Sequence, residues 1–384
     1  MHYFLLFILV FKISIKTEKL ISSQYYGKIY PFTTRIEFTE TGLVLIYSID
    51  LKSNFTIAVV ENIKSDHDIV KEAFITVNNN EIKCIERRSS ISIYDEKSVI
   101  KDYHYYLTNS HNFDLINGKS IGFGFAFKFE DERFSLIHQL FSQGKISKKA
   151  FGIGDYITQS EYGDLYYGGI PEEDIQNKQF KGKCKVNPSY STWSCKLISV
   201  DIGGNSYYTE NEHMYFQTNS KFMIVPKKFL LFLNFTILKQ FNGNCFFREY
   251  GNAIHTFKCI NDIVYVLPNY TFVFDDYTFS IPMKEFFQLG NEISESILLS
   301  DTKITGDKDI WVFGNHFLSK YIKLFDYDDE SITFYSDQYL IKPNKNKKIY
   351  NNNISQKLLL RLICFTSLIC SCFVIINVII KKFF

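Results

Sequence analysis

The sequence is poor in alanine and has little excess charge of either sign, and both shortages exclude classes of protein. Only five of the 384 residues are Ala, whereas Phe (38) and Tyr (26) are abundant. Strand formers therefore outweigh helix formers, which disfavours a helix bundle. Lys and Arg total 43 against 41 Asp and Glu, and 46% of the residues are hydrophobic. We therefore expect neither a basic surface that holds nucleic acid nor wholesale disorder.

Several motifs of catalysis and metal binding are also missing. The chain has no glycine-rich phosphate loop, no HExxH and no Gly-x-Ser-x-Gly turn. No CxxC and no Cys/His cluster with zinc spacing occurs. We therefore expect no metal and no cofactor, and the sequence disfavours nucleotide-dependent, zinc-dependent and serine-hydrolase chemistry.

The N-terminus is an apolar run over residues 3–11 that is too short to span a bilayer. Its position is that of the hydrophobic region of a secretory signal peptide, which we assign to residues 1–17. Because the basic flank and a small-residue cleavage site are missing, an N-terminal core strand is the alternative interpretation.

The C-terminus carries an uncharged, mostly apolar run over residues 362–380, which is long enough for one transmembrane helix. Residues 341–361 are rich in Asn and Lys and predict a flexible polar stalk, and residues 381–384 would be a cytosolic tail. With the signal peptide, this predicts a single-pass protein of the secretory pathway or cell surface whose body lies outside the cytosol. A glycolipid-anchor signal is the competing interpretation. Lys381-Lys382 resembles either a retrieval signal or a stop-transfer flank.

Five cysteines lie outside the apolar C-terminal run. A secretory context favours disulfides, and the spacing suggests two local loops, Cys184–Cys195 and Cys245–Cys259, with Cys84 left over. Each loop would stabilise the fold by on the order of 3 kcal/mol. Passage through the secretory pathway also fits the presence of four Asn-x-Ser/Thr sequences. The glycosylation candidates are Asn54, Asn234, Asn269 and Asn353.

The body of the chain has the pattern of an all-β protein, because short alternations of apolar and polar residues end at turn residues. The runs we expect to be strands are 43–49, 57–60, 121–129, 165–167, 222–225, 270–274 and 332–335. Helical candidates are few: residues 134–141, and residues 226–235, which open with a proline at a first-turn position.

The segment from Trp311 to Asp326 resembles, without a gap, the late segment of pepsin-like aspartic proteases. The family pattern there is Trp-apolar-Leu-Gly-Asp-x-Phe, then Tyr, then Phe-Asp, and Asn315 stands in place of the family's Asp. Further blocks follow in family order at residues 25–29, 140–151, 163–170, 193–202 and 267–274, and Cys245–Cys259 falls where the family has a disulfide.

The resemblance implies an all-β, bilobal fold with a cleft between the lobes. The N-terminal β-lobe would be residues 25–175 and the C-terminal β-lobe residues 176–340. A generic β-sandwich is the alternative.

Proteases of this family use two aspartates, one per lobe, each in an Asp-Thr/Ser-Gly turn. The pair shares a proton, activates a water and protonates the leaving amine. In this sequence the first position is Asp50, but Leu51 and Lys52 follow it where Thr and Gly belong. The family's second Asp-Thr-Gly-Thr-Ser aligns with Gln217-Thr218-Asn219-Ser220-Lys221, so the second aspartate is Gln217. A different register would bring in Asp201 or Glu212 instead.

Gln217 cannot accept a proton, so the resemblance implies a peptidase domain without proteolytic activity. We expect the Asp50 and Gln217 side chains to meet by a direct hydrogen bond or through one water. The flap keeps only its Tyr, and the residues expected to line the cleft or flap are Tyr94, Ser53, Thr218, Asn219 and Ser220. The cleft would bind an extended peptide or protein ligand by main-chain hydrogen bonds. The alternatives are an active aspartic endopeptidase with an atypical site, and a surface structural or adhesion protein on the same scaffold.

Overall fold

The strands of the protein form two sheets of similar size. The computed structural model describes residues 21–26, 33–38, 43–51, 53, 56–59, 69–77, 80–93, 99–108, 121–156, 162–209, 213–218, 220, 222–236, 238–241, 243–250, 254–301 and 310–343. Within these residues, each sheet has thirteen strands.

The first sheet follows the order β11-β25-β24-β9-β10-β1-β2-β6-β7-β4, with β3 beside β2 and β8, and β5 beside β6. Its strands are β1 (Ile21–Tyr26), β2 (Thr33–Phe38), β3 (Leu43–Asp50), β4 (Ile57–Val59), β5 (Ile69–Val77), β6 (Asn80–Ile93), β7 (Val99–Thr108), β8 (Ile121–Gly124), β9 (Ala150–Tyr156), β10 (Tyr162–Tyr167), β11 (Phe180–Lys185), β24 (Ile322–Asp326) and β25 (Ser331–Ser336).

The second sheet follows the order β20-β21-β17-β22-β15-β23-β14-β12-β18-β19-β26, with β13 beside β12 and β16 beside β17. Its strands are β12 (Ser194–Ile202), β13 (Asn205–Tyr208), β14 (His213–Phe216), β15 (Met223–Ile224), β16 (Cys245–Tyr250), β17 (Ile254–Ile260), β18 (Asn269–Phe274), β19 (Tyr277–Pro282), β20 (Phe287–Gln288), β21 (Ile293–Ser296), β22 (Leu298–Asp301), β23 (Trp311–Phe313) and β26 (Leu340–Pro343).

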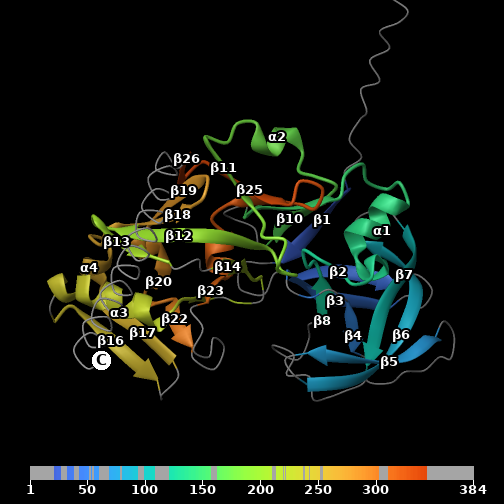
Figure 1. Ribbon diagram of the computed structural model, residues 1–384, viewed down its shortest axis with the longest axis horizontal. Helices are drawn as coiled ribbons and strands as arrows, with labels where there is room; N and C mark the ends of the chain where they lie inside the picture. Colours follow the sequence, from blue (N-terminus) through green and yellow to red (C-terminus); the bar gives the residue numbers. More distant parts are fainter. Residues whose placement is uncertain are drawn as a thin grey trace, which may run out of the picture.

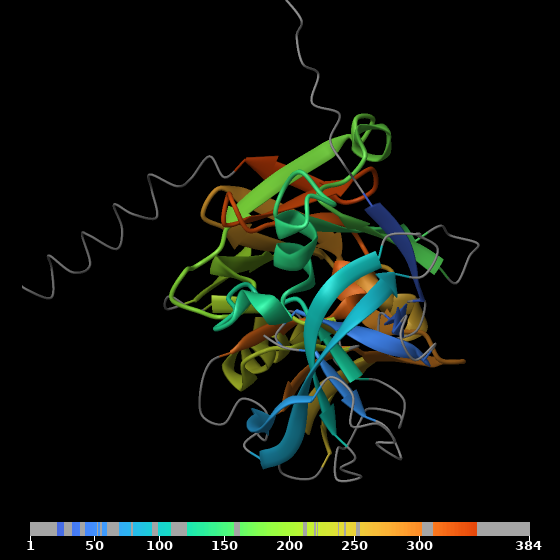
Figure 2. The same ribbon diagram turned by 90° about the vertical axis from the view of Figure 1, so that its right-hand side faces the viewer.

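The two sheets form two lobes, which stand side by side in Figure 1 with β10 and β25 above and between them. In Figure 2 the blue and cyan strands of the first lobe face the viewer, and the green and red strands that join the lobes lie above them. This joining region is the part of the first sheet that contains β9, β24, β25 and β11.

Two strands from late in the chain, β24 and β25, complete the first sheet. β24 pairs with β9, so Lys323 lies opposite Ile153, and β25 pairs with β11. Every residue of β25 is buried, as expected of a strand covered on both faces. The buried Lys323 is satisfied because its ammonium donates to the Leu318 carbonyl at 2.8 Å. The two lobes are therefore bound together by a shared sheet.

Trp193 is fully buried and packs aromatic rings where the lobes meet. Its ring lies 5.8 Å from Phe151, 5.1 Å from Phe325 and 4.9 Å from Tyr327. The Phe151 and Phe325 rings stack on each other at 4.6 Å. Aromatic pairs of this kind contribute about 0.5–1.5 kcal/mol each beyond burial, so the cluster stabilises the junction.

Helices are short, and the longest, α3 (Lys227–Thr236), packs against strands of the second sheet. The helices are the 3₁₀ turns η2 (Glu132–Phe134), η3 (Leu238–Phe241) and η4 (Met283–Phe286), and the α-helices α1 (Leu136–Ser142), α2 (Glu172–Ile175), α3, α4 (Asn261–Val264) and α6 (Asn315–Leu318). Ser135 caps α1, because its side chain accepts from the His138 N–H at 3.4 Å. Both predicted helices are confirmed as α1 and α3.

Most predicted strands are confirmed, among them β3, β4, β10, β18 and β25. The run 121–129 is an exception, because β8 ends at Gly124. Beyond that point the Phe125 N–H donates to the Asp50 carbonyl at 2.8 Å instead of continuing a ladder. The one-turn helices α2, α4 and α6 were not predicted, since four residues are too few to show a 3.6-residue period.

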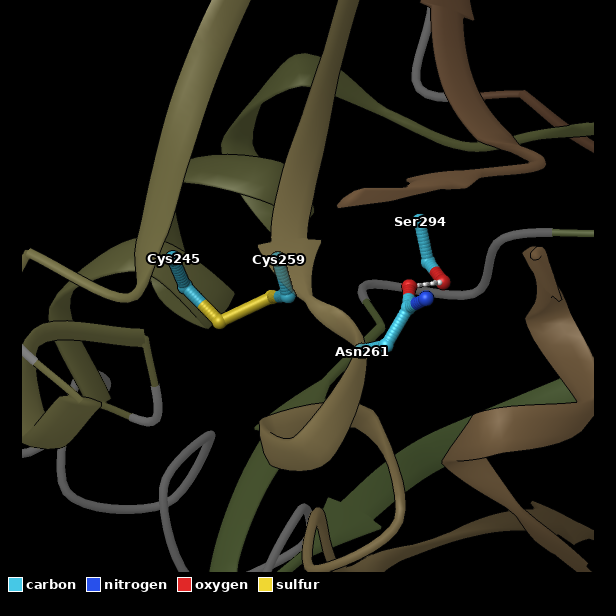
Figure 3. The surroundings of a disulfide bond; sticks show 4 residues. All are labelled: Cys245, Cys259, Asn261 and Ser294. Carbon is cyan, nitrogen blue, oxygen red and sulfur yellow. Dashed lines mark hydrogen bonds between the residues drawn. A yellow bond between two sulfur atoms is a disulfide. The ribbon is translucent and has the colours of Figure 1, made fainter. Parts of the chain in front are cut away.

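Both predicted disulfides are present. The Cα atoms are 6.0 Å apart in Cys184–Cys195 and 4.1 Å apart in Cys245–Cys259, and the second bond joins β16 to β17 (Figure 3). Cys84 is a buried free thiol, and burial raises its pKa to about 11, with Glu86 adding to the effect. This thiol is therefore protonated and unreactive at neutral pH.

In the part of the chain that the structure describes, no helix has both the length and the apolar character needed to cross a membrane. The predicted signal peptide (1–17), transmembrane run (362–380) and cytosolic tail (381–384) lie outside the described residues, as do Asn54 and Asn353. β26 reaches residue 343, and the rest of the predicted stalk lies beyond it.

Candidate active site

Asp50 is the last residue of β3, a strand of the first lobe. β3 runs parallel to β8, with Ile49 opposite Phe123 and Asp50 opposite Gly124. Asp50 is half-buried, and its carboxylate accepts a hydrogen bond from the Ser53 N–H at 3.3 Å. The Ser53 carbonyl in turn accepts from the Ala126 N–H at 3.0 Å. The chain thus turns sharply after Asp50, and this turn holds the carboxylate in place.

Gln217 follows β14 in the second lobe. β14 runs parallel to β23, with Phe216 opposite Phe313, and the Gln217 N–H donates to the Phe313 carbonyl at 3.1 Å. Ser220 ends the turn: its carbonyl accepts from the Asn315 N–H at 2.7 Å. Gln217 and Ser220 are both half-buried, like Asp50 and Ser53.

The two parallel strand pairs have the same register. In each, the residue before the turn lies opposite a phenylalanine that precedes a glycine: Ile49 opposite Phe123, and Phe216 opposite Phe313. Gln217 therefore has the position in the second lobe that Asp50 has in the first. Of the two equivalent side chains, the first can carry a negative charge and the second is a neutral amide.

One hydrogen bond ties the two turns together. The hydroxyl of Thr218 donates to the carbonyl of Ile49, 169 residues away, and Thr218 is fully buried. Leu51 has the equivalent position in the first turn and is also fully buried, but its side chain has no donor. Of these two side chains, therefore, only that of Thr218 can donate a hydrogen bond to the opposite turn.

A buried hydroxyl pair supports the first turn from behind. Thr56 Oγ1 accepts from the Gly124 N–H at 3.4 Å and lies 2.7 Å from the Tyr103 hydroxyl. Tyr103 donates onward to the Phe134 carbonyl at 3.0 Å, and burial raises its pKa well above the usual range. Tyr103 therefore stays neutral. Sequence reasoning missed this pair, since it treated Thr56 only as the third residue of the Asn54 glycosylation sequence.

Aromatic side chains hold the segment that follows β8. The Trp193 indole N–H donates to the Phe125 carbonyl at 2.7 Å, and the Tyr327 hydroxyl donates to the Ala126 carbonyl at 3.0 Å. In the sequence, Trp193 stood out only as the first residue of the block 193–202 that resembles the family. Its link to the site could not be seen in the sequence, because the partners are far apart along the chain.

The structure brings together Asp50, Ser53, Thr218 and the backbone of Gln217. The expected meeting of the Asp50 and Gln217 side chains, directly or through one water, stays a prediction. Tyr94 of the flap, Asn219 and Lys52 lie outside the described residues. Within the described part, no three His, Cys, Asp or Glu side chains gather as a metal site would require.

The comparisons with known proteins agree with this geometry. A family model described as eukaryotic aspartyl protease matches residues 108–336, which is more than half of the chain and includes Gln217 but not Asp50. The solved structure of an aspartic proteinase from Irpex lacteus superposes with a TM-score of 0.64 at 13% identity, covering 83% of this chain and 98% of that one. Comparison with curated proteins gives no match. The chain belongs to the eukaryotic aspartyl protease family, and its fold is that of the pepsin-like enzymes.

Proposed function

We propose that this chain is a pepsin-like domain without protease activity, which binds an extended peptide between its lobes and is anchored in a membrane of the secretory pathway. The observation that carries the proposal is the shared register of the two parallel strand pairs, which makes Gln217 the counterpart of Asp50. The family's chemistry needs a carboxyl group at both positions.

The missing carboxyl group removes half of the acid–base pair. A water between the turns would have Asp50 as its base, but no second carboxyl group would share its proton or protonate the leaving amine. Loss of such a proton-transfer role costs about 10²–10⁴-fold in rate. Leu51 adds to the effect, because its apolar side chain is buried where a hydroxyl would help to orient the carboxylate.

Peptide binding does not need the missing carboxyl group. An extended peptide is held mainly by main-chain hydrogen bonds, which depend on the backbone of the two lobes. The fold keeps both lobes, the shared sheet and the Thr218 to Ile49 bond. Two disulfides fit an extracytosolic compartment, and the apolar run 362–380 would supply the anchor.

The test is cleavage of an unstructured protein at acidic pH, with and without a pepstatin-type statine inhibitor. We expect no inhibitor-sensitive cleavage, and we expect the inhibitor or an extended peptide to bind in a calorimetric titration. Inhibitor-sensitive cleavage by the unmodified chain would instead support the active alternative, which the retained Asp50–Ser53 turn favours. Neither cleavage nor binding would support a structural or adhesive role.

A further inference from the structure

Two of the four Asn-x-Ser/Thr sequences lie in described residues, and their surroundings differ. Asn234 is half-buried inside α3, and the hydroxyl of Thr236 in the same sequence donates to the Phe232 carbonyl of the helix at 2.6 Å. Asn269 is exposed and is the first residue of β18, and the hydroxyl of Thr271 in its sequence donates to Ser280 Oγ at 3.3 Å. Both threonine hydroxyls are thus hydrogen-bonded, and the difference lies in the exposure of the asparagine. An attached oligosaccharide is bulky and needs an acceptor amide that faces solvent. The fold therefore favours Asn269 over Asn234.

Exposed apolar side chains surround α4, close to Asn269. We call them the tip patch. It comprises Ile260 before the helix, Tyr265 and Val266 after it, and Leu289 and Ile293 on the neighbouring segment, with exposed fractions of 37, 60, 63, 57 and 44%. Soluble domains seldom leave a group of large apolar side chains open to water unless something covers it.

The tip patch is held in a fixed arrangement. The Asn261 amide donates to the Gly290 and Asn291 carbonyls at 3.0 and 3.1 Å, and the Ser294 hydroxyl donates to Asn261 Oδ1 at 2.6 Å (Figure 3). Cys259, which precedes Ile260, is bonded to Cys245. These contacts fix the segment 289–293 against α4. The apolar side chains are thus exposed on an ordered surface.

Asn269 lies beside the aromatic part of this patch. Val266 is three residues before it in the chain. Across the β18–β19 ladder, Asn269 lies opposite Pro282, and the ammonium of Lys284, two residues further, lies 5.9 Å from the centre of the Tyr265 ring. A sugar chain leaving Asn269 would therefore start next to Tyr265 and Val266.

We propose that Asn269 carries an N-linked oligosaccharide and that this oligosaccharide covers the tip patch. In the transfer, the Asn269 amide nitrogen bonds to C1 of the first sugar of a lipid-linked oligosaccharide pyrophosphate. The bond from C1 to the pyrophosphate oxygen breaks, the amide loses one proton, and the lipid pyrophosphate leaves. The inference rests on the secretory route within the proposed function, but it does not depend on the absence of proteolysis.

The test uses the full chain produced in glycosylating eukaryotic cells. Peptides are released after enzymatic deglycosylation in ¹⁸O-labelled water, which converts a glycosylated Asn to a labelled Asp. We expect the label at Asn269. Thr271→Ala should remove one oligosaccharide from the mass of the protein, and Thr271→Ser, which keeps the acceptor sequence, should not. Asn234→Gln is the matched control and should leave the mass unchanged apart from the substitution.

Covering of the tip patch is measured separately. Enzymatic removal of the oligosaccharide from the folded protein should raise the fluorescence of an apolar dye severalfold, and Tyr265→Ser with Val266→Ser should abolish that rise. An unmodified Asn269 in molecules glycosylated elsewhere would overturn the inference. A glycosylated Asn269 without a change in dye binding would overturn the covering role. If no Asn is modified, the inference and the secretory route fail together, and the cleavage assay still decides the proposed function.

Discussion

The turn at Asp50 and the turn at Gln217 follow strand pairs of the same register but present different chemical groups. Both follow a strand whose parallel partner carries a Phe-Gly sequence at its end, Phe123-Gly124 or Phe313-Gly314, and both end at a serine. The first turn presents a carboxylate and the second an amide. The comparison shows that strand pairing and the Phe-Gly sequence preserve the geometry of a site independently of the residue that performs its chemistry.

The two turns also differ in what supports them. Side chains from distant parts of the chain, Trp193 and Tyr327, bond to the segment behind the first turn. Behind the second turn, backbone atoms approach Gly314 closely. A Cβ added at Gly314 would lie 2.3 Å from the Ser220 carbonyl oxygen and 2.4 Å from the Phe222 carbonyl oxygen. The first turn should therefore be sensitive to side-chain truncation, and the second to any added Cβ.

The largest expected effect comes from making the chemistry of the two turns alike. Gln217→Asp together with Leu51→Thr and Lys52→Gly restores the missing second carboxyl group and the family's first turn. We expect acidic cleavage of an unstructured protein to rise by about 10²-fold or more over the unmodified chain, the scale of one acid–base group. The measurement is the rate of fluorescent peptide release at acidic pH, with and without a statine inhibitor.

Gln217→Asp alone is the control for this triple change. It should restore little activity, since Leu51 and Lys52 still follow Asp50. If the single change gives as much cleavage as the triple change, the first turn is already competent and the difference between the turns is confined to residue 217. If the triple variant folds but binds no inhibitor, the assignment of Gln217 to the second position is wrong.

Gly314→Ala should strongly destabilise the second turn. The added Cβ meets two carbonyl oxygens that cannot move without opening the turn, so we expect a loss of at least about 3 kcal/mol in the free energy of unfolding. Gly204→Ala is the matched control. Its φ of +83° is strained for Ala, but no atom lies within 4 Å, so about 1–2 kcal/mol should be lost. Urea unfolding of the three proteins measures both values, and equal losses would contradict the close approach at Gly314.

Thr218→Val should remove the bond that ties the turns together. The side chain keeps its shape, but the buried Ile49 carbonyl loses its donor, which costs about 1–2 kcal/mol. We expect the two lobes to unfold at separate urea concentrations in this variant. The control is Thr256→Val. It removes hydrogen bonds to the carbonyls of Ser296 and Leu298, which lie within one sheet, so we expect a single urea unfolding transition at a shifted concentration. A single transition in both variants would show that the shared sheet alone couples the lobes.

A smaller, pH-dependent effect is expected at Glu285, whose backbone carbonyl is hydrogen-bonded to His316 of α6. Burial alone would raise the pKa of the Glu285 carboxyl, but hydrogen bonds from Lys320 and Tyr339 outweigh it and hold the pKa below its ordinary value of 4.5. The folded state thus takes up this proton at lower pH than the unfolded chain does. The stabilisation is complete at neutral pH and is lost as the pH falls through 4.5 and below.

Glu285→Gln tests this contribution. We expect the variant to be about 0.5–1 kcal/mol less stable than the parent at neutral pH and equal to it at strongly acidic pH. Thermal unfolding across the pH range measures the difference between the two. A difference that stays constant at every pH would mean that Glu285 acts through packing and not through its charge.

Local patterns in the sequence predicted the local parts of the fold. Alternation of apolar and polar residues gave β3, β18 and β25, and the segment from Trp311 to Asp326 gave the family. The pairing of β24 with β9, however, depends on which distant strand meets which. No periodicity within either strand contains that information, so the shared sheet was outside the reach of pattern reasoning.

The site was predictable to the same degree. Asp50 and Gln217 could be assigned because each follows an apolar strand at the point where the resemblance places an Asp-Thr/Ser-Gly turn. The supporting contacts, Thr56 with Tyr103 and Thr218 with Ile49, could not be predicted. The sequence around a single threonine does not show whether its hydroxyl forms a buried hydrogen bond or faces solvent in a turn. Gln217 itself was visible in the sequence, but how its side chain meets that of Asp50 depends on side-chain placement that only the fold decides.

The late strands of the first sheet have a consequence for biosynthesis. A ribosome that has delivered residue 156 has made all of β9 but not its partner β24, which begins at Ile322. One edge of β9 therefore waits, unpaired, while the whole second lobe is synthesised, and unpaired strand edges invite misassembly. Pairings so distant in sequence also slow folding. A chain released before Asp326 would leave that edge permanently open, and such truncated molecules should be retained by chaperones even though every residue of the first turn is present.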